Sequence, residues 1–322
     1  MTTVPTATGA VAGDELGVTL MHEHVFVLDD ALERDLPHPE WDEEAAIEAA
    51  TATFARLAAL GVGTVVDLTV PGLGRDVARV RRVASRSPVA IVVATGWYVR
   101  GDLPPFFGTH GPGRLVGGAD PLEALFVRDL EEGIAGTGVR AAVIKVVSDE
   151  PGLTPDVTRV LDAAAAAHVR TGAPIMTHSH APTRGGLAQQ EALAARGVDL
   201  GRVVIGHAGD SEDLDYLRML ADRGSFLGFD RFGMAHTQSD DARVRTLLAL
   251  LERGYAESIV LSHDAAVFSR VTPPSWRARE TPDWRMDHLA TRIVPRLRAA
   301  GVDDATMRTM QVDNPRRILA GR

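Results

Sequence analysis

The chain has 322 residues, of which 45% are hydrophobic and 24% are charged, a composition typical of a globular protein with a large apolar core. Its formal net charge of −9 argues against a nucleic-acid partner or an anionic membrane surface and favours a small-molecule substrate. The chain contains no cysteine, which excludes disulfides and thiolate metal sites, so any metal ion would need nitrogen and oxygen ligands.

The N-terminal region shows no targeting signal. Residues 1–15 carry neither a basic region nor a long apolar core, so they do not resemble a secretion signal. No part of the chain approaches the run of about 18 uninterrupted apolar residues that a membrane helix needs. We therefore expect a cytoplasmic protein that binds neither a membrane nor nucleic acid.

Short apolar runs rich in β-branched residues alternate with helical patterns along the chain. The predicted strands cover residues 17–21, 64–68, 89–95, 141–148, 174–177, 202–205, 225–229 and 258–261. The helical patterns cover residues 43–60, 76–85, 121–134, 155–170, 186–196, 241–253 and 286–300, with a further helix after residue 210. Residues 102–119 and the proline-rich segment after residue 264 are predicted loops. Alternating strands and helices without a linker indicate a (β/α)8 barrel, which we expect to form a single domain over residues 1–322 with a short N-terminal extension.

Lys145 is the only lysine among the 34 lysine and arginine residues, and it lies in the middle of the apolar run 141–148. A desolvated lysine can lose its proton and become a neutral nucleophile, whereas arginine stays charged. The alternative is a structural lysine that pairs with a carboxylate in the core or extends toward solvent from the strand end.

Potential metal ligands follow several of the predicted strands. His22 and His24 come directly after the first strand, and residues two apart in an extended segment point to the same side. Such a pair alone is weak evidence, because solvated and core histidines are common. The other strand-end residues are His178 after the fifth strand, His207 after the sixth and Asp264 after the eighth. The C-terminal ends of barrel strands converge on one face, so these side chains and Lys145 should meet there.

Six nitrogen and oxygen ligands exceed what one tetrahedral zinc ion takes and suit two divalent ions about 3.5–4 Å apart. The ligand that bridges them would be Lys145, carboxylated on its amine by carbon dioxide. This modification turns a buried neutral amine into an anionic oxygen donor, which explains why arginine could not serve.

The sequence resembles the phosphotriesterase family of the amidohydrolase superfamily, and the resemblance extends from Leu16 to residues 312–317. The motifs that carry the resemblance are GVTLMHEH at 17–24, the isolated lysine of the fourth strand, TH at 177–178, GH at 206–207 with Asp210, GFDR at 228–231 and SHD at 262–264.

The resemblance implies which residues hold which ion. His22, His24 and Asp264 would hold the more buried ion, His178 and His207 the more exposed one, and carboxylated Lys145 would join both together with a bridging hydroxide. Zinc is the first expectation for the ions, with cobalt, manganese or iron as alternatives. Asp264 would then collect and shuttle the proton of the nucleophile. His180 and His263 have no counterpart in the family's ligand set, and we expect them to be structural or to lie behind the ligands.

Two residues point to one branch of the family. Phosphotriesterases proper carry a histidine where Arg231 stands, and it completes a proton relay with the aspartates equivalent to Asp264 and Asp210. The lactonase branch resembles this chain more closely, with arginine at that place and a tyrosine at the position of Tyr98. Many lactonases that cleave acyl-homoserine lactones carry a tryptophan a few residues after the aspartate equivalent to Asp264. This chain lacks that tryptophan and has residues 268–271 at the same place.

We therefore expect a binuclear-metal hydrolase that opens lactone rings and has organophosphate triesterase activity as a side reaction. Its substrate would be a small lactone or ester, and the family resemblance suggests a homodimer. Two alternatives remain, an organophosphate triesterase proper and a catalytically silent barrel that only binds metal.

Overall fold

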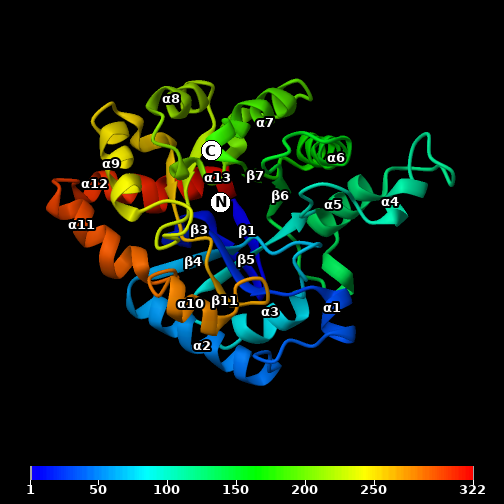
Figure 1. Cartoon of the computed structure of the whole chain (residues 1–322), viewed down its shortest axis with the longest axis horizontal. Coiled ribbons are helices and arrows are strands. Elements are labelled where there is room, and N and C mark those ends of the chain that lie inside the picture. Colours follow the sequence, from blue (N-terminus) through cyan, green and yellow to red (C-terminus); the bar gives the residue numbers. More distant parts are fainter. Residues whose placement is uncertain (1, 322) are drawn as a thin grey trace.

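The computed structural model describes residues 2–321, apart from the side chains of residues 30 and 31. At its centre lies a parallel sheet (Figure 1). Its strand order is β10-β9-β8-β7-β6-β5-β4-β3-β11. The strands are β3 (Val18–Val27), β4 (Val62–Asp67), β5 (Ala90–Gly96), β6 (Val143–Val147), β7 (Ile175–His178), β8 (Val203–Ile205), β9 (Phe226–Phe229), β10 (Ile259–Leu261) and β11 (Ala266–Ser269).

The sheet closes into a barrel through the segment that contains β10 and β11. β10 pairs with β9, whereas β11, a few residues further on, pairs with β3 at the opposite end of the sheet. Between them Asp264 donates its backbone N–H to the carbonyl of His22 at 2.9 Å, and His24 donates to the carbonyl of Ala265 at 2.8 Å. The two short strands thus share the eighth position of the ring, and the predicted (β/α)8 barrel is confirmed.

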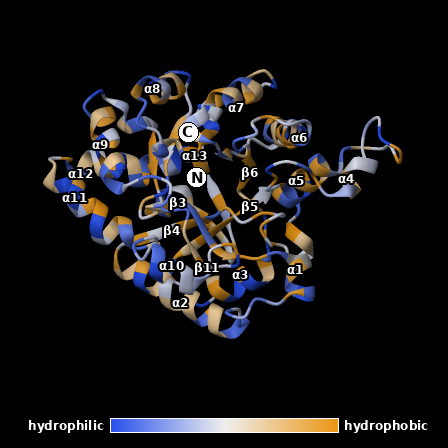
Figure 2. Cartoon of the chain, in the orientation of Figure 1, coloured by the Kyte–Doolittle hydropathy of each residue, from blue (hydrophilic) through white to orange (hydrophobic). Residues whose placement is uncertain are grey.

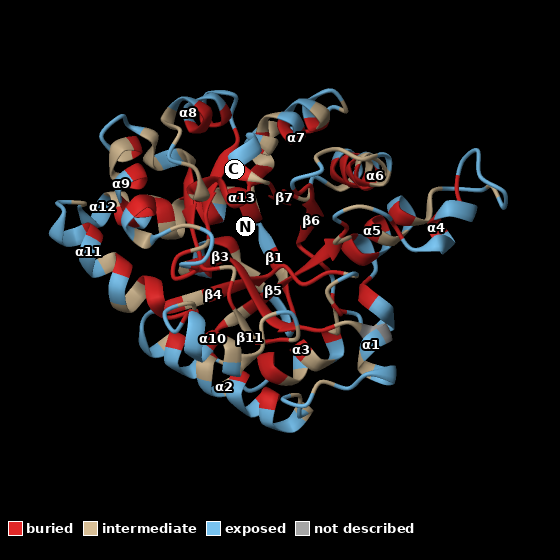
Figure 3. Ribbon diagram, in the orientation of Figure 1, coloured by how far each residue is buried: buried red, intermediate tan, exposed pale blue. Residues whose placement is uncertain are grey.

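Helices surround the sheet, with buried residues on the side facing the strands and exposed residues on the outside (Figure 3). Hydrophobic and hydrophilic residues are both present on most of these helices (Figure 2). They are α1 (Asp30–Asp35), α2 (Glu43–Ala59), α3 (Val77–Ala84), α4 (Pro105–Thr109), α5 (Pro121–Glu131), α6 (Pro155–Thr171), α7 (Gly185–Ala194), α8 (Leu214–Asp222), α9 (Asp240–Leu251), α10 (Pro274–Glu280), α11 (Val294–Ala299), α12 (Asp304–Arg308) and α13 (Asn314–Ala320). Within the described residues, no helix is long and apolar enough to cross a membrane.

Several boundaries differ from the sequence-based expectations. The first strand does not end before the histidines but continues to Val27, because β11 pairs with its second half. The predicted loop 102–119 contains α4, and the proline-rich segment after residue 264 contains β11 and α10. The expected helix over 286–300 is split into a π-helical turn, Leu289–Ile293, and α11, whose second residue is a proline that lacks the backbone donor.

The N-terminal segment forms a hairpin of β1 (Thr3–Thr6) and β2 (Gly9–Ala12), which the sequence analysis did not assign. Ala7 at its turn donates to the carbonyl of Ile91 near the start of β5, at 2.8 Å. Val4 belongs to an apolar cluster that also contains Met21, Val92 and Met176 on three barrel strands. This cluster fills the barrel toward the N-terminal ends of its strands and leaves the C-terminal ends to polar residues.

Candidate metal centre

The C-terminal ends of the barrel strands surround a cavity of about 540 Å³. All of the predicted site residues except the buried His207 line it directly, and His207 lies against two that do. The lining residues among the predicted ones are His22, His24, Tyr98, Lys145, His178, Asp210, Arg231 and Asp264. The structure therefore brings together side chains from seven regions of the chain that are far apart in the sequence.

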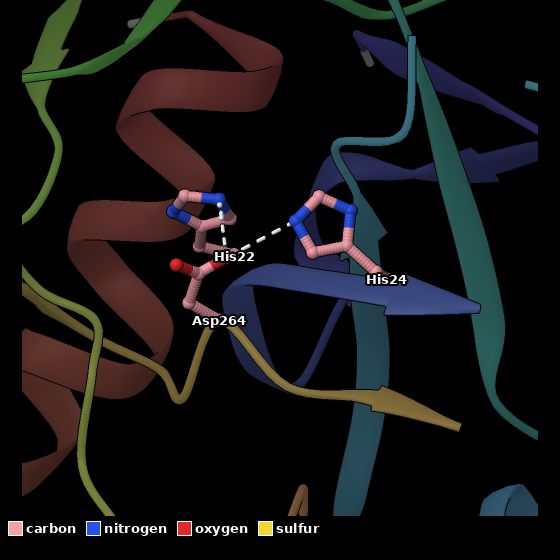
Figure 4. A group of neighbouring side chains, drawn as sticks. All are labelled: His22, His24 and Asp264. Carbon is pink, nitrogen blue, oxygen red and sulfur yellow. Dashed lines mark hydrogen bonds and ion pairs between the residues drawn. The ribbon is translucent and has the colours of Figure 1, made fainter. Parts of the chain in front are cut away.

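His22 and His24 on β3 and Asp264 after β10 form the first group of potential ligands (Figure 4). Oδ1 of Asp264 lies 3.2 Å from Nε2 of His22 and 3.1 Å from Nε2 of His24. The backbone of Asp264 has φ of 54°, a left-handed conformation that costs energy in a residue other than glycine. Pairing of its N–H with β3 holds the carboxylate in place between the imidazoles.

His178 and His207 form the second group. Nδ1 of His178 lies 3.0 Å from Nε2 of His207, so both atoms face one small volume beside the first group. His207 also has a left-handed backbone, with φ of 61°. Its ring stacks on that of His22 at a centroid distance of 5.1 Å, which places the two groups next to each other. His207 and Asp264, two residues with this strained backbone, are thus both candidate ligands.

Lys145 on β6 lies at the base of both groups and is almost fully buried. Its Nζ is 3.2 Å from Nε2 of His22 and 3.3 Å from the carbonyl oxygen of Thr177. Among the side chains that the structure describes, no carboxylate forms an ion pair with Nζ, and the charges of Asp264 and Asp230 act on the amine from further away. Burial lowers the pKa of Lys145 to about 8, so a neutral amine is accessible near physiological pH.

Three of the candidate imidazoles, those of His22, His178 and His207, are held in the neutral form that binds metal. Burial lowers the pKa values of His22 and His207, and it lowers that of His178 to about 4. Burial alone would raise the pKa of Asp264, but its interaction with His22, its hydrogen bond with His24 and the guanidinium of Arg231 hold it well below its usual range. Neutral imidazoles and an anionic carboxylate aimed at shared points fit divalent cations.

Asp230, directly before Arg231, is a buried residue that the sequence analysis did not assign to the site. Its Oδ2 accepts a hydrogen bond from Nδ1 of His22 at 2.8 Å, and its Oδ1 accepts from Nδ1 of His207 at 3.0 Å. Its Oδ1 also accepts from the backbone N–H of His207 at 2.8 Å. Asp230 could itself join a metal group with these two histidines, but both of its oxygens are already used. It thus orients a candidate ligand of each group.

The other two histidines have oxygen partners of their own. Nδ1 of His24 donates to Oγ1 of Thr69 at 2.9 Å, and that hydroxyl donates to Oδ1 of Asp67 at 2.6 Å. Nε2 of His178 lies 3.5 Å from Oδ2 of Asp149. Every candidate imidazole therefore turns one nitrogen toward the cavity and the other toward a supporting oxygen. No local motif could have shown these partners, because each comes from another strand end.

Arg231 links the metal groups to Asp210. It donates from Nε to Oδ2 of Asp264 and from Nη1 to Oδ2 of Asp210, both at 3.1 Å. Burial alone would lower the pKa of Arg231, but the carboxylates of Asp264 and Asp210 raise it, so the guanidinium stays cationic. Tyr98 lies on the other side of the cavity, with its ring edge-on to that of His178 at 6.0 Å. Burial raises the pKa of Tyr98, which keeps it a phenol and a hydrogen-bond donor.

Trp97, His263 and Trp284 lie near the candidate ligands but differ in their surroundings. His263 and Glu23 are both buried and pair with each other at 2.5 Å. Trp97 packs against Phe107 at 4.8 Å. Trp284, which the sequence analysis did not single out, lines the cavity and donates from its indole nitrogen to the carbonyl of His263 at 2.9 Å.

This barrel, with imidazoles, carboxylates and a buried lysine around one cavity, has the fold and the potential ligands of a metal-dependent hydrolase. The model of the phosphotriesterase family matches residues 2–319, and the chain belongs to that family.

Individual relatives agree with this assignment. The solved structure of the phosphotriesterase from Mycobacterium tuberculosis is 47% identical, with a TM-score of 0.96 and coverage of 98% of each chain. The aryldialkylphosphatase of Saccharolobus solfataricus is 36% identical over 313 residues, which are 97% of each chain. A structure from work on organophosphate hydrolysis activity engineered from a weak promiscuous lactonase template is 33% identical, with a TM-score of 0.84 and coverage of 98% and 99%.

Proposed function

We propose that this hydrolase opens lactone rings with a binuclear metal centre and that organophosphate triester hydrolysis is a side reaction. The observation that carries the proposal is Arg231, a permanent cation held between Asp264 and Asp210 at the edge of the metal groups. A relative derived from a lactonase template supports this choice, and the aryldialkylphosphatase supports the side reaction.

The proposed ligand sets follow the two groups of side chains. His22, His24 and Asp264 would hold one ion, His178 and His207 would hold the second, and Lys145, carboxylated to a carbamate, would be a ligand for both. In the modification the neutral amine adds to carbon dioxide, an N–C bond forms and one proton leaves. When bound, two divalent cations would lower the pKa of a shared water and polarise the oxygen of the ester. Zinc suits this mixed nitrogen and oxygen set, and cobalt, manganese or iron are alternatives.

The chain's own residues orient the lactone and move the proton. Attack on a lactone carbonyl places negative charge on the carbonyl oxygen and then on the ring oxygen, which stays attached to the product. Arg231 and the phenol of Tyr98 both line the cavity and can donate to these oxygens. Asp264 can accept the proton of the nucleophile through its carboxylate. Arg231 cannot act as a base, so the histidine relay of phosphotriesterases proper has no equivalent.

The proposal is tested with a panel of lactones of varied ring size and tail length, paraoxon and metal analysis of the purified protein. We expect kcat/KM for at least one lactone to exceed that for paraoxon by roughly tenfold or more, about 1.4 kcal/mol of transition-state discrimination. Arg231→His should narrow this gap by slowing lactone opening more than paraoxon hydrolysis. If paraoxon is the better substrate across the panel, or the substitution leaves the ratio unchanged, the triesterase alternative replaces the lactonase.

Three further expectations remain proposals. The chain would form a single domain over residues 1–322, assemble as a homodimer and work in the cytoplasm. Sedimentation equilibrium of the purified protein measures the oligomeric state, and a monomer at micromolar concentration would contradict the homodimer.

A further inference from the structure

Arg243, in the first turn of α9, has a guanidinium with no exposed surface. It donates from Nε and Nη2 to Oδ1 of Asp210 at 3.0 and 2.6 Å. The other oxygen of Asp210 accepts from Arg231, which in turn donates to Asp264. Arg243, Asp210, Arg231 and Asp264 therefore form a continuous chain of ion pairs. It leads from the protein interior to Asp264, a candidate metal ligand.

The same guanidinium holds residues 233–239, the segment between β9 and α9. Nη1 of Arg243 donates to the carbonyl of Gln238 at 2.7 Å, and Nη2 donates to Oγ1 of Thr237 at 2.7 Å and to the carbonyl of Met234 at 3.3 Å. Met234, His236 and Thr237 line the cavity, whereas Arg243 does not. The buried side chain of Arg243 therefore holds one wall of the cavity in place through hydrogen bonds on the side away from the cavity.

Asp240 holds the other end of this segment. Its Oδ1 accepts from the backbone N–H of Gly233 at 2.9 Å, and its Oδ2 lies 2.7 Å from Nε2 of His288. Gly233 has φ of 86°, and a Cβ atom there would lie 2.3 Å from the carbonyl oxygen of Asp283. The segment is therefore tightly confined, and its position depends on the buried groups beneath it.

We propose that Arg243 is a positioning residue that sets the substrate selectivity of this site, by fixing Arg231 through Asp210 and the cavity wall through residues 233–239. A guanidinium has five N–H donors in one plane, enough to reach a carboxylate and several groups of the segment, whereas an ammonium has three on one atom. The inference rests on the proposed function in that Arg231 and this wall contact the substrate. A purely structural ion pair would stabilise the fold without affecting selectivity.

The test compares Arg243→Lys with Arg159→Lys as a matched control. Arg159 likewise pairs with an aspartate, donating from Nε to Oδ2 of Asp120 at 2.8 Å, and likewise holds a loop, through the carbonyls of His110 and Phe107. It does not line the cavity. Each variant is measured for metal content, thermal midpoint, kinetics on the wild-type enzyme's best lactone and on paraoxon, and hydrogen exchange.

In Arg243→Lys we expect metal content to match the wild type and kcat/KM for the lactone to fall by about tenfold to a hundredfold, the scale of effects from small misplacements. Paraoxon hydrolysis should fall less, so the ratio of the two activities shifts, and amides of residues 233–239 should exchange faster. Arg159→Lys should lower the thermal midpoint but leave the ratio unchanged.

The proposal is overturned if Arg243→Lys changes the ratio no more than Arg159→Lys does, or if its losses simply track loss of metal. If Arg243→Lys does not fold, Asp240→Asn loosens the same segment from its other end and should shift the same ratio. Should paraoxon be the wild type's better substrate, the lactonase proposal fails, but the shift of the ratio relative to the wild type still tests Arg243.

Discussion

Replacing Asp230 by asparagine should weaken both ion sites, because this one carboxylate supports a candidate ligand of each. The substitution keeps the size of the side chain but leaves a single carbonyl oxygen. In the structure, one oxygen accepts from His22 and the other accepts twice from His207. If the remaining carbonyl keeps the two bonds to His207, the new NH2 group faces Nδ1 of His22. That nitrogen must then accept, which moves the ring proton to Nε2, the atom that points toward Asp264.

The magnitude follows from the role of such supporting groups. Loss of a residue that orients a metal-bound histidine typically costs about 10- to 100-fold in metal affinity, which is about 1.4–2.8 kcal/mol. The asparagine cannot accept a hydrogen bond from both imidazoles. We therefore expect metal affinity to fall by this factor at one ion site and by a smaller factor at the other. Asp149→Asn is the matched control, since Asp149 faces only His178 among the four candidate imidazoles.

The assay is release of metal to a chromophoric chelator, together with the metal content of the purified variants by mass spectrometry. The wild type should release two ions slowly, Asp149→Asn should release one of them faster, and Asp230→Asn should release both faster. If Asp230→Asn keeps two ions with the release rates of the wild type, Asp230 does not orient the ligands, and its hydrogen bonds serve folding alone.

Two other predictions concern the lysine and the histidines. Lys145→Ala should lose most bound metal and nearly all activity, with partial rescue by short carboxylic acids that fill the vacated space; two tightly bound ions in this variant would contradict the bridging role. The metal-free protein should lose stability as the pH falls from about 6.5 toward about 4, the pKa that burial gives His178, because over this range the unfolded chain binds the proton that the folded protein excludes. The free energy of unfolding should fall by roughly 3 kcal/mol over this range because of His178, which urea unfolding at several pH values measures. His178→Gln should make the unfolding free energy less dependent on pH. An unchanged pH dependence in that variant would show that His178 does not cause the effect.

The sequence by itself determined the architecture and the candidate metal ligands. Apolar runs with a strand-like composition alternate with helical patterns, and these signals are local, so eight barrel positions could be counted before any contact was known. The ligands could be found for a related reason, since the barrel places the ends of all strands on one face. The single lysine of the chain stood out by composition alone.

Tertiary structure alone decided how the ring closes and what supports the ligands. The eighth position is shared by β10 and β11, and the pairing of β11 with β3 joins segments about as far apart in the sequence as the barrel allows. The hydrogen bond between His22 and Asp230 spans 208 positions, and the one between Arg243 and Asp210 spans 33. Hydrogen-bond partners of this kind cannot be recognised from a periodic pattern in the sequence. A buried polar group needs only an acceptor in the right place, and closure of the barrel decides which residue supplies it.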